Sequence, residues 1–307
     1  MASTLDTADK NLIQAASVGA ELFNDVLTSA PVVSALTNRK VIAGTVYKGL
    51  KRSANPAGGW RTINSGVAPD SSTYENTTVN LALFDQPLKI DAAFAKAVNG
   101  TAAVEDVLVE ESKAAAESLV NGIDYAAFNL VSNGCSGFDA LAGLTVNAWT
   151  GTYVSGISGE DTSRAYFVKT PELEIVFGGN DLMAMGEWDQ QLVSDGNGGE
   201  YKAYVNSLET WVAFNPKSSY SIARVVNISE DSPFTDALVS EVVSQNKGKP
   251  YDVCFLSRNS LKQLQDSRAT ALSGSSAAIQ ESMAEKSYGI KLVVSDNIAD
   301  DNTALDV

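Results

Sequence analysis

The side chains that most enzymes use for acid–base chemistry are scarce in this sequence. The 307 residues include no histidine, which removes the usual general base and, with it, the Ser-His-Asp and Cys-His triads. The adjacent acids Glu110 and Glu111 lie on an expected helix, where a solvated face is the ordinary role of such a pair. We therefore expect no catalytic site and no cofactor. A hydrolase that uses paired carboxylates stays a distant alternative, and it would need both acids in one pocket.

Two further patterns resemble metal or thiol motifs but have simpler explanations. The run from Asp195 to Glu200 begins like a calcium loop, yet Glu200 replaces the glycine required at the sixth position, and the glutamate expected six residues later is missing. A hairpin turn explains this run better. Cys135 and Cys254 lie far apart without a CxxC pair, so they predict neither a zinc site nor a disulfide framework. We expect both thiols to be structural, no metal to be bound, and the compartment to be a reducing cytoplasm.

The charged residues point to assembly rather than to chemistry. A formal charge of −15 excludes the whole chain as a binder of phosphate backbones, which requires a basic surface. Basic residues nevertheless occur in the polar segment 41–90, where they would meet acidic surface on a neighbouring subunit and make assembly salt-sensitive. Solubility and edge protection are the alternative explanation. The candidates for contact between subunits are Lys48, Lys51, Arg52, Trp60 and Arg61.

The segment 41–90 is expected to form a long two-stranded arm. Thr, Asn, Ser and Gly dominate it, residues 55–59 mark a turn, and residues 78–83 alternate as a strand does. A strand of about 18 residues spans about 60 Å, whereas a compact globule of this length has a radius of gyration of about 19 Å. An isolated ribbon is marginal in water, so we expect it to lie on a neighbouring copy. A meander folded back on its own domain is the alternative.

Two helices are expected on either side of the arm. Apolar residues recur at spacings of three and four over residues 8–28, which predicts an amphipathic docking helix that stops before Pro31. The same spacing from Thr101 to Ser132 predicts one long helix, which at full length would span about 48 Å. Gly122 is the position where this helix could kink or end early.

The remainder of the chain mixes strands and helices, which predicts an α+β fold without internal repeats. A turn over Gly196 to Gly199 joins two of the strands. No stretch approaches the roughly 18 apolar residues of a membrane span, and residues 1–10 lack a signal sequence, so we expect neither membrane insertion nor export. Strands are predicted over Arg164–Lys169, Glu172–Phe177, Glu200–Asn206, Thr210–Phe214, Ile222–Ile228, Tyr251–Leu256 and Ile290–Ser295, and helices from Ser232-Pro233 through Val243 and over Arg258–Ser267.

The order of these elements resembles the major capsid proteins of tailed bacteriophages, which have the Hong Kong 97-like fold. The sequence is most similar to the branch found in some short-tailed phages, and the resemblance covers residues 8 to 298. Ala140 departs from the commoner form, which has glycine there. The phrases that carry the resemblance are, in order, Val120-Asn121-Gly122-Ile123-Asp124, Gly137-Phe138-Asp139-Ala140-Leu141, Ala165-Tyr166-Phe167-Val168, Asn197 to Tyr204, Trp211, Arg224-Val225-Val226-Asn227-Ile228 and Phe255-Leu256-Ser257-Arg258-Asn259.

The resemblance implies a subunit of four parts. These are an N-terminal arm and helix over 1–40, an extended loop over 41–90 that overlaps the adjacent subunit, a peripheral domain with the spine helix over 91–140, and an axial domain with returning peripheral strands over 141–307. Some relatives join this loop covalently to a neighbour through a lysine and an asparagine. Lys48 or Lys51 would be that lysine here, although most relatives lack the bond.

The resemblance also implies the partners. Hexamers and pentamers of the chain would build an icosahedral head that encloses double-stranded DNA, assembled in the bacterial cytoplasm with a separate scaffolding protein, a portal and, in some relatives, a decoration protein. An acidic inner wall would let the DNA slide during packaging, and a shell interior mapped as basic would contradict that hypothesis. The alternatives are an encapsulin shell around an enzyme cargo and, further behind, the carboxylate hydrolase or a β-rich adhesion module.

Overall fold

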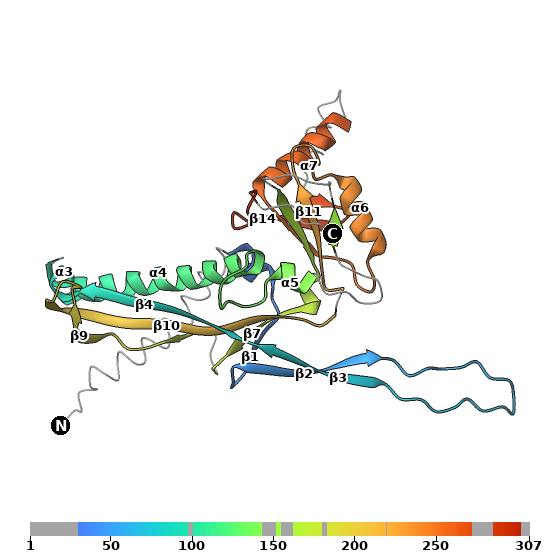
Figure 1. Cartoon of the computed structure of the whole chain (residues 1–307), viewed down its shortest axis with the longest axis horizontal. Helices are drawn as coiled ribbons and strands as arrows, with labels where there is room; N and C mark the ends of the chain where they lie inside the picture. Colours follow the sequence, from blue (N-terminus) through green and yellow to red (C-terminus); the bar gives the residue numbers. More distant parts are fainter. Residues whose placement is uncertain are drawn as a thin grey trace.

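The computed structural model describes residues 30–97, 101–142, 152–154, 162–179, 183–218, 220–271 and 285–301. The helix expected over residues 8–28 lies outside these ranges. Figure 1 shows three parts: an elongated body in which a long helix lies along a sheet, a hairpin arm that extends from one end of the body, and a second sheet with its own helices.

The body is built on a six-stranded sheet. Its strand order is β1-β7-β10-β4, and β8 and β9 also pair with β10; β1 runs parallel to β7, and the other pairs are antiparallel. Short elements flank the sheet, including α2 (Pro31–Ala35), α3 (Ala92–Ala97) and the 3₁₀ turn η1 (Thr170–Glu172). The strands are β1 (Arg39–Val41), β4 (Ala82–Asp91), β7 (Leu173–Gly178), β8 (Ala184–Met185), β9 (Asp189–Ser194) and β10 (Glu200–Pro216).

The two strands expected over 200–206 and 210–214 are one strand of 17 residues, β10, so that prediction is corrected. The polar residues between them do not break the strand, because Leu208 is buried and Glu209 is exposed, which keeps the alternation of a half-buried strand. Pairing also crosses the expected gap, since β4 runs beside β10 from Ala203 to Val212 without a shift. The result is a long, continuous body sheet.

One long helix, α4 (Thr101–Phe128), covers the body sheet and confirms the expected spine. It ends four residues before the predicted end and passes through Gly122 without a break. A Cβ at Gly122 would lie 2.4 Å from Cε2 of Phe84 on β4. Glycine therefore stands here because helix and sheet approach closely, and neither a kink nor an end is needed to explain it.

Replacing Gly122 with alanine tests this explanation. Helix propensity alone favours alanine by about 1 kcal/mol, but the overpacking against Phe84 is expected to reverse the sign and destabilise the subunit by about 1–3 kcal/mol. Urea unfolding measures the difference. In a Phe84→Leu background the same substitution should be neutral or stabilising, and a stabilising effect in the wild-type background would show that the close approach is unimportant.

The second sheet has the order β13-β14-β12-β6-β11-β5. Helices α6 (Asp236–Gln245) and α7 (Arg258–Ala271) pack on one of its faces. Alternate residues of β6 divide between two cores: Ala165 and Phe167 face these helices, while Tyr166 and Val168 join the body core with α4. The strands are β5 (Thr152–Val154), β6 (Ser163–Val168), β11 (Ile222–Ile228), β12 (Val253–Leu256), β13 (Lys286–Ser287) and β14 (Ile290–Val294).

Candidate assembly surfaces

The arm is an antiparallel hairpin of β2 (Val46–Ala54) and β3 (Thr73–Asn80). Figure 1 shows it leaving the body at the end opposite β9 and α3 and extending beyond both sheets. Leu81 separates β3 from β4, so the strand expected over residues 78–83 is two strands that belong to different sheets. The hairpin itself was predicted, whereas residues 82–90 pair with β10 in the body.

The arm tip, residues 55–72, has its own internal hydrogen bonds. Asp70 accepts one from the backbone N–H of Ala57 at 2.6 Å across the tip, and this bond and a second one from Ser71 lower the pKa of the Asp70 carboxyl. A turn over Thr62 to Ser65 places Asn64 in the left-handed region, with φ of 67°. These bonds give the tip a defined shape that requires no contact with the body.

The contact candidates lie on the exposed surface of the arm where the structure describes them. Lys48 on β2 is exposed, Trp60 at the tip is fully exposed, and Arg61 is exposed while donating to the carbonyl of Ser65. Lys51 lies in β2 together with Arg52, and the side chains of these two fall outside the described part. Their role between subunits stays a prediction.

The base of the arm is fixed to the body by a small apolar cluster. Leu81, Val176 and Ala213 are buried there, and half-buried side chains pack around them: Ile42, Tyr47, Val79 and Trp211. Lys40 adds a hydrogen bond to the Tyr47 hydroxyl at 3.1 Å and a cation–π contact with its ring. Packing at the base thus sets the direction of the arm. The rest of the arm is not covered by the described parts of the body.

The charge of the arm is opposite to that of the chain. Between Val46 and Asn80 the sequence has four basic residues and two acidic residues, a net charge of +2 in a chain of −15. Such an imbalance favours contact with an acidic surface. The basic residues are Lys48, Lys51, Arg52 and Arg61, and the acidic residues are Asp70 and Glu75.

The segment Gly137 to Leu141 connects the body to the second sheet. We call such a set of connecting contacts a joint. Phe138, at the start of α5 (Phe138–Ala142), is fully buried and packs edge-on against three rings, those of Phe128, Tyr166 and Phe214. A Cβ at Gly137 would lie 2.5 Å from the carbonyl oxygen of Ala126. Only glycine fits between the end of α4 and this aromatic cluster.

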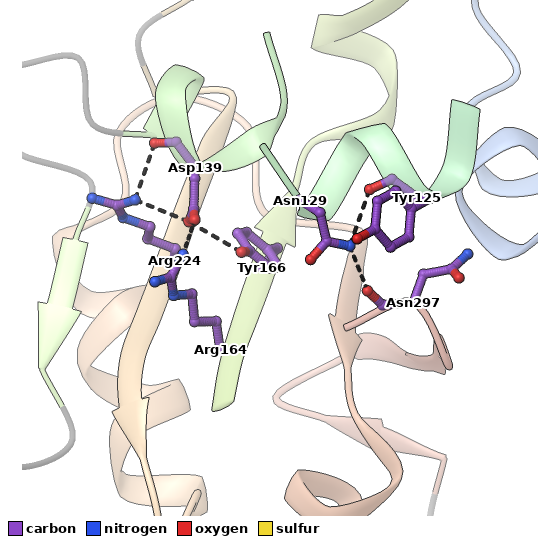
Figure 2. Close-up of polar contacts among 7 residues, drawn as sticks. All are labelled: Tyr125, Asn129, Asp139, Arg164, Tyr166, Arg224 and Asn297. Carbon is purple, nitrogen blue, oxygen red and sulfur yellow. Dashed lines mark hydrogen bonds and ion pairs between the residues drawn. The ribbon is translucent and has the colours of Figure 1, made fainter. Parts of the chain in front are cut away.

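Asp139 holds α5 to two strands of the second sheet, as Figure 2 shows. Its carboxylate forms ion pairs with Arg164 on β6 and with Arg224 on β11, the latter at 2.9 Å, and accepts a hydrogen bond from the Tyr166 hydroxyl at 3.0 Å. Arg224 also donates to the backbone carbonyl of Asp139. One carboxylate therefore binds two largely buried guanidinium groups, and this contact was not predicted from the sequence.

A second joint gathers around Asp124, which is fully buried on α4. Its carboxylate accepts hydrogen bonds from the backbone N–H of Val32 at 2.7 Å, from Ser295 at 3.3 Å and from Asn297 at 3.1 Å. Asn129 continues the joint by donating to the carbonyls of Tyr125 and Asn297, as drawn in Figure 2. The spine helix is thus tied to segments from both ends of the chain.

Burial raises the pKa of Asp124, although its hydrogen-bond donors oppose the shift. Because the folded state then binds the proton more tightly than the unfolded state, this group stabilises the fold at low pH, and its contribution is lost as pH rises through the folded-state pKa. Asp124→Asn removes the titration. As pH falls from 7 to 4, wild type should gain stability relative to this variant in urea unfolding. A relative loss would mean that the carboxylate is stabilised in its ionised form.

The remaining motifs have structural roles. The run from Asp195 is a hairpin turn between β9 and β10, in which the carboxylate accepts from the N–H groups of Asn197 and Gly199. Cys135 and Cys254 are both buried, and burial raises the pKa of Cys135 to about 11.

Within the described ranges no three His, Cys, Asp or Glu side chains gather as a metal site would require. None of the helices described there is long and apolar enough to cross a membrane.

The fold is similar to that of two solved phage structures. A chain of the bacteriophage Epsilon15 structure aligns with a TM-score of 0.61 and 17% identity, covering 88% of each chain. A chain of the bacteriophage JBD30 capsid aligns with a TM-score of 0.50 and 8% identity, covering 86% of this chain and 89% of that one. At such identities the likeness shows the fold, and the expected α+β Hong Kong 97-like fold is confirmed.

Comparison of sequences adds nothing to this finding, since no family model and no curated protein matches the chain.

Proposed function

We propose that this chain is the major capsid protein of a tailed bacteriophage and that it self-assembles into the icosahedral head shell around double-stranded DNA. The observation that carries the proposal is the fold shared with the Epsilon15 chain over 88% of both chains. The basic arm supports it independently, because an isolated extended hairpin is marginal in water and one of net charge +2 in an acidic chain suits contact with another molecule.

Membership in the branch of short-tailed phages is the finer part of the proposal. It is supported by the order of the sequence phrases, and the structure gives two of them a physical role. Phe138 and Asp139 form one joint of the subunit, and Asp124 forms the other. The four parts expected from the resemblance, with boundaries at residues 40, 90 and 140, stay part of the proposal, although β4 (Ala82–Asp91), at the end of the second part, pairs with β10 in the body.

The partners follow from this function. The chain would form hexamers and pentamers in the host cytoplasm, guided by a separate scaffolding protein, closed at one vertex by a portal and, in some heads, covered by a decoration protein. DNA would contact the shell through non-specific proximity, as the acidic charge of the chain suggests. The chain would end in the virion, would act with no enzymatic activity, and would have no association with membrane.

An encapsulin-type shell is the competing function on the same fold, and the contents of the particle separate the two. We expect particles purified from lysed host cells to contain this chain as their most abundant protein and to protect double-stranded DNA from nuclease. Mass spectrometry and nuclease digestion check both points. Particles that hold a folded enzyme and no protected DNA would contradict the phage assignment and support the encapsulin alternative.

A further inference from the structure

The hairpin turn between β9 and β10 contains an asparagine followed by a glycine, Asn197-Gly198. Such a pair is chemically labile, because the glycine nitrogen can reach the asparagine side chain with no Cβ in the way. The structure describes three pairs of this kind, the others being Asn121-Gly122 and Asn133-Gly134. Asn99-Gly100 lies outside the described residues. The backbone around each pair decides whether it reacts in the folded chain.

The reaction is a deamidation in which water is the only co-reactant. The glycine nitrogen loses its proton to hydroxide and forms a bond to Cγ of the asparagine. The bond from Cγ to Nδ2 then breaks, and Nδ2 takes a proton from water and leaves as ammonia. Water finally opens the resulting imide ring at either carbonyl, which leaves aspartate or isoaspartate. The reaction therefore needs a glycine N–H that no acceptor holds and a backbone that can rotate.

Two of the three pairs are protected by backbone hydrogen bonds. Gly122 lies inside α4, so its N–H donates to the carbonyl four residues earlier, that of Ser118. The N–H of Gly134 donates to the carbonyl of Val131 at 3.0 Å, which closes a turn. Exposure does not distinguish the pairs, because the asparagine is exposed in all three. The difference lies in the glycine N–H.

The pair Asn197-Gly198 lacks this protection. Asp195 accepts hydrogen bonds from the N–H groups of Asn197 and Gly199, at 2.8 Å and 2.9 Å. The N–H between them, that of Gly198, has no acceptor among the described residues, and the side-chain amide of Asn197 forms no hydrogen bond with them either. The whole turn is exposed, and a Cβ built on Gly198 would meet no atom within 4 Å. Rotation of this backbone therefore disturbs no packing, as is typical of segments that open at little cost.

We propose that Asn197 is a site of spontaneous deamidation in the folded subunit, with the Gly198 nitrogen as the internal nucleophile. The reaction adds one negative charge to a chain of −15. The new charge lies between Asp195 and Glu200 in the sequence of the turn, where like charges repel. The isoaspartate product also inserts a methylene group into the backbone beside the pair Ser194 and Glu200, which opens the β9–β10 ladder. The modified fraction increases with the age of the subunit, and no other copy of the chain is involved.

Timed deamidation of the purified full-length subunit tests the proposal. Samples are kept at mildly alkaline pH, and their peptides are sequenced by mass spectrometry, which detects the replacement of the amide by a carboxyl group at each site. We expect the deamidated fraction at Asn197 to exceed those at Asn121 and Asn133 by at least about tenfold, because the latter two react only after local opening. An equal fraction at either of those two sites would overturn the proposal. Isomerisation at Asp195, which also precedes a glycine, leaves mass and charge unchanged and is not counted.

Two controls separate the folded geometry from the local sequence. In concentrated urea the protecting hydrogen bonds are lost, so all three sites should react at similar rates. If Asn197 led by the same factor in urea, the local sequence rather than the turn would set its rate, and the structural argument would fail. The variant Asn197→Gln keeps the amide and the charge but requires a larger ring for the attack, so this position should stay unmodified over the same time. Loss of ammonia from the variant at the wild-type rate would show that the Gly198 nitrogen is not the nucleophile.

Discussion

Replacing Asp139 with alanine is expected to lower the free energy of unfolding by about 3 kcal/mol. This value is the lower end of the range for breaking a buried ion pair, and we choose it because the carboxylate is partly exposed. Its side chain is 29% exposed, while those of Arg164 and Arg224 are 15% and 14% exposed. The substitution would leave two largely buried cations without their counter-charge. Guanidinium unfolding of the subunit measures the loss.

Asp296→Ala is the matched control for this prediction. Asp296 also pairs with an arginine, Arg258, but both side chains are exposed to solvent, at 69% and 77%. Pairs of this kind contribute little to stability, so the control should unfold almost as wild type does. If Asp139→Ala were as stable as this control, the joint at α5 would hold the two sheets together by apolar packing alone.

Deleting Lys51 to Asp70 is expected to leave a folded subunit that forms no stable shells. The deletion joins Leu50 directly to Ser71. Leu50 and Asn76 pair across the hairpin, and the residues left between them, Ser71 to Glu75, form a connection of a length that occurs in β-hairpins. The tip makes its hydrogen bonds within itself, so its loss should cost the body no contact. Circular dichroism and thermal melting check the fold, and sedimentation checks assembly. Shells of normal yield and stability would show that the arm has no structural role.

Sequence patterns predicted the strands of the second sheet most accurately. β11 has the predicted bounds, Ile222–Ile228, and β12 and β14 differ from the predictions by one or two residues. β11 and β12 are buried on both faces along nearly all of their length, so they appear in the sequence as largely apolar runs that end where burial ends. β9 was missed because nearly all of its residues are exposed. Its pairing with β10 depends on backbone hydrogen bonds, which leave no periodicity in the sequence.

The joints could not be predicted, because each depends on residues that are distant in the chain. Gly122 looked like a helix breaker, and only the approach of Phe84 from β4 explains it. Asp139 stood in a recognised phrase, yet its role depends on two arginines, Arg164 and Arg224, 25 and 85 positions away. The opposed acids Asp85 and Glu209 are likewise neighbours only in the register of β4 against β10.

Electron microscopy of the purified protein, with size-exclusion chromatography on the same sample, tests the central claim most directly. The account predicts closed shells, or tubes and rings of hexamers, alone or with the scaffolding partner. It also predicts that assembly weakens as salt rises, because the contacts of the basic arm are screened. A clean monomer at every salt and protein concentration, with the scaffolding partner present, would contradict the claim that this chain is a shell subunit.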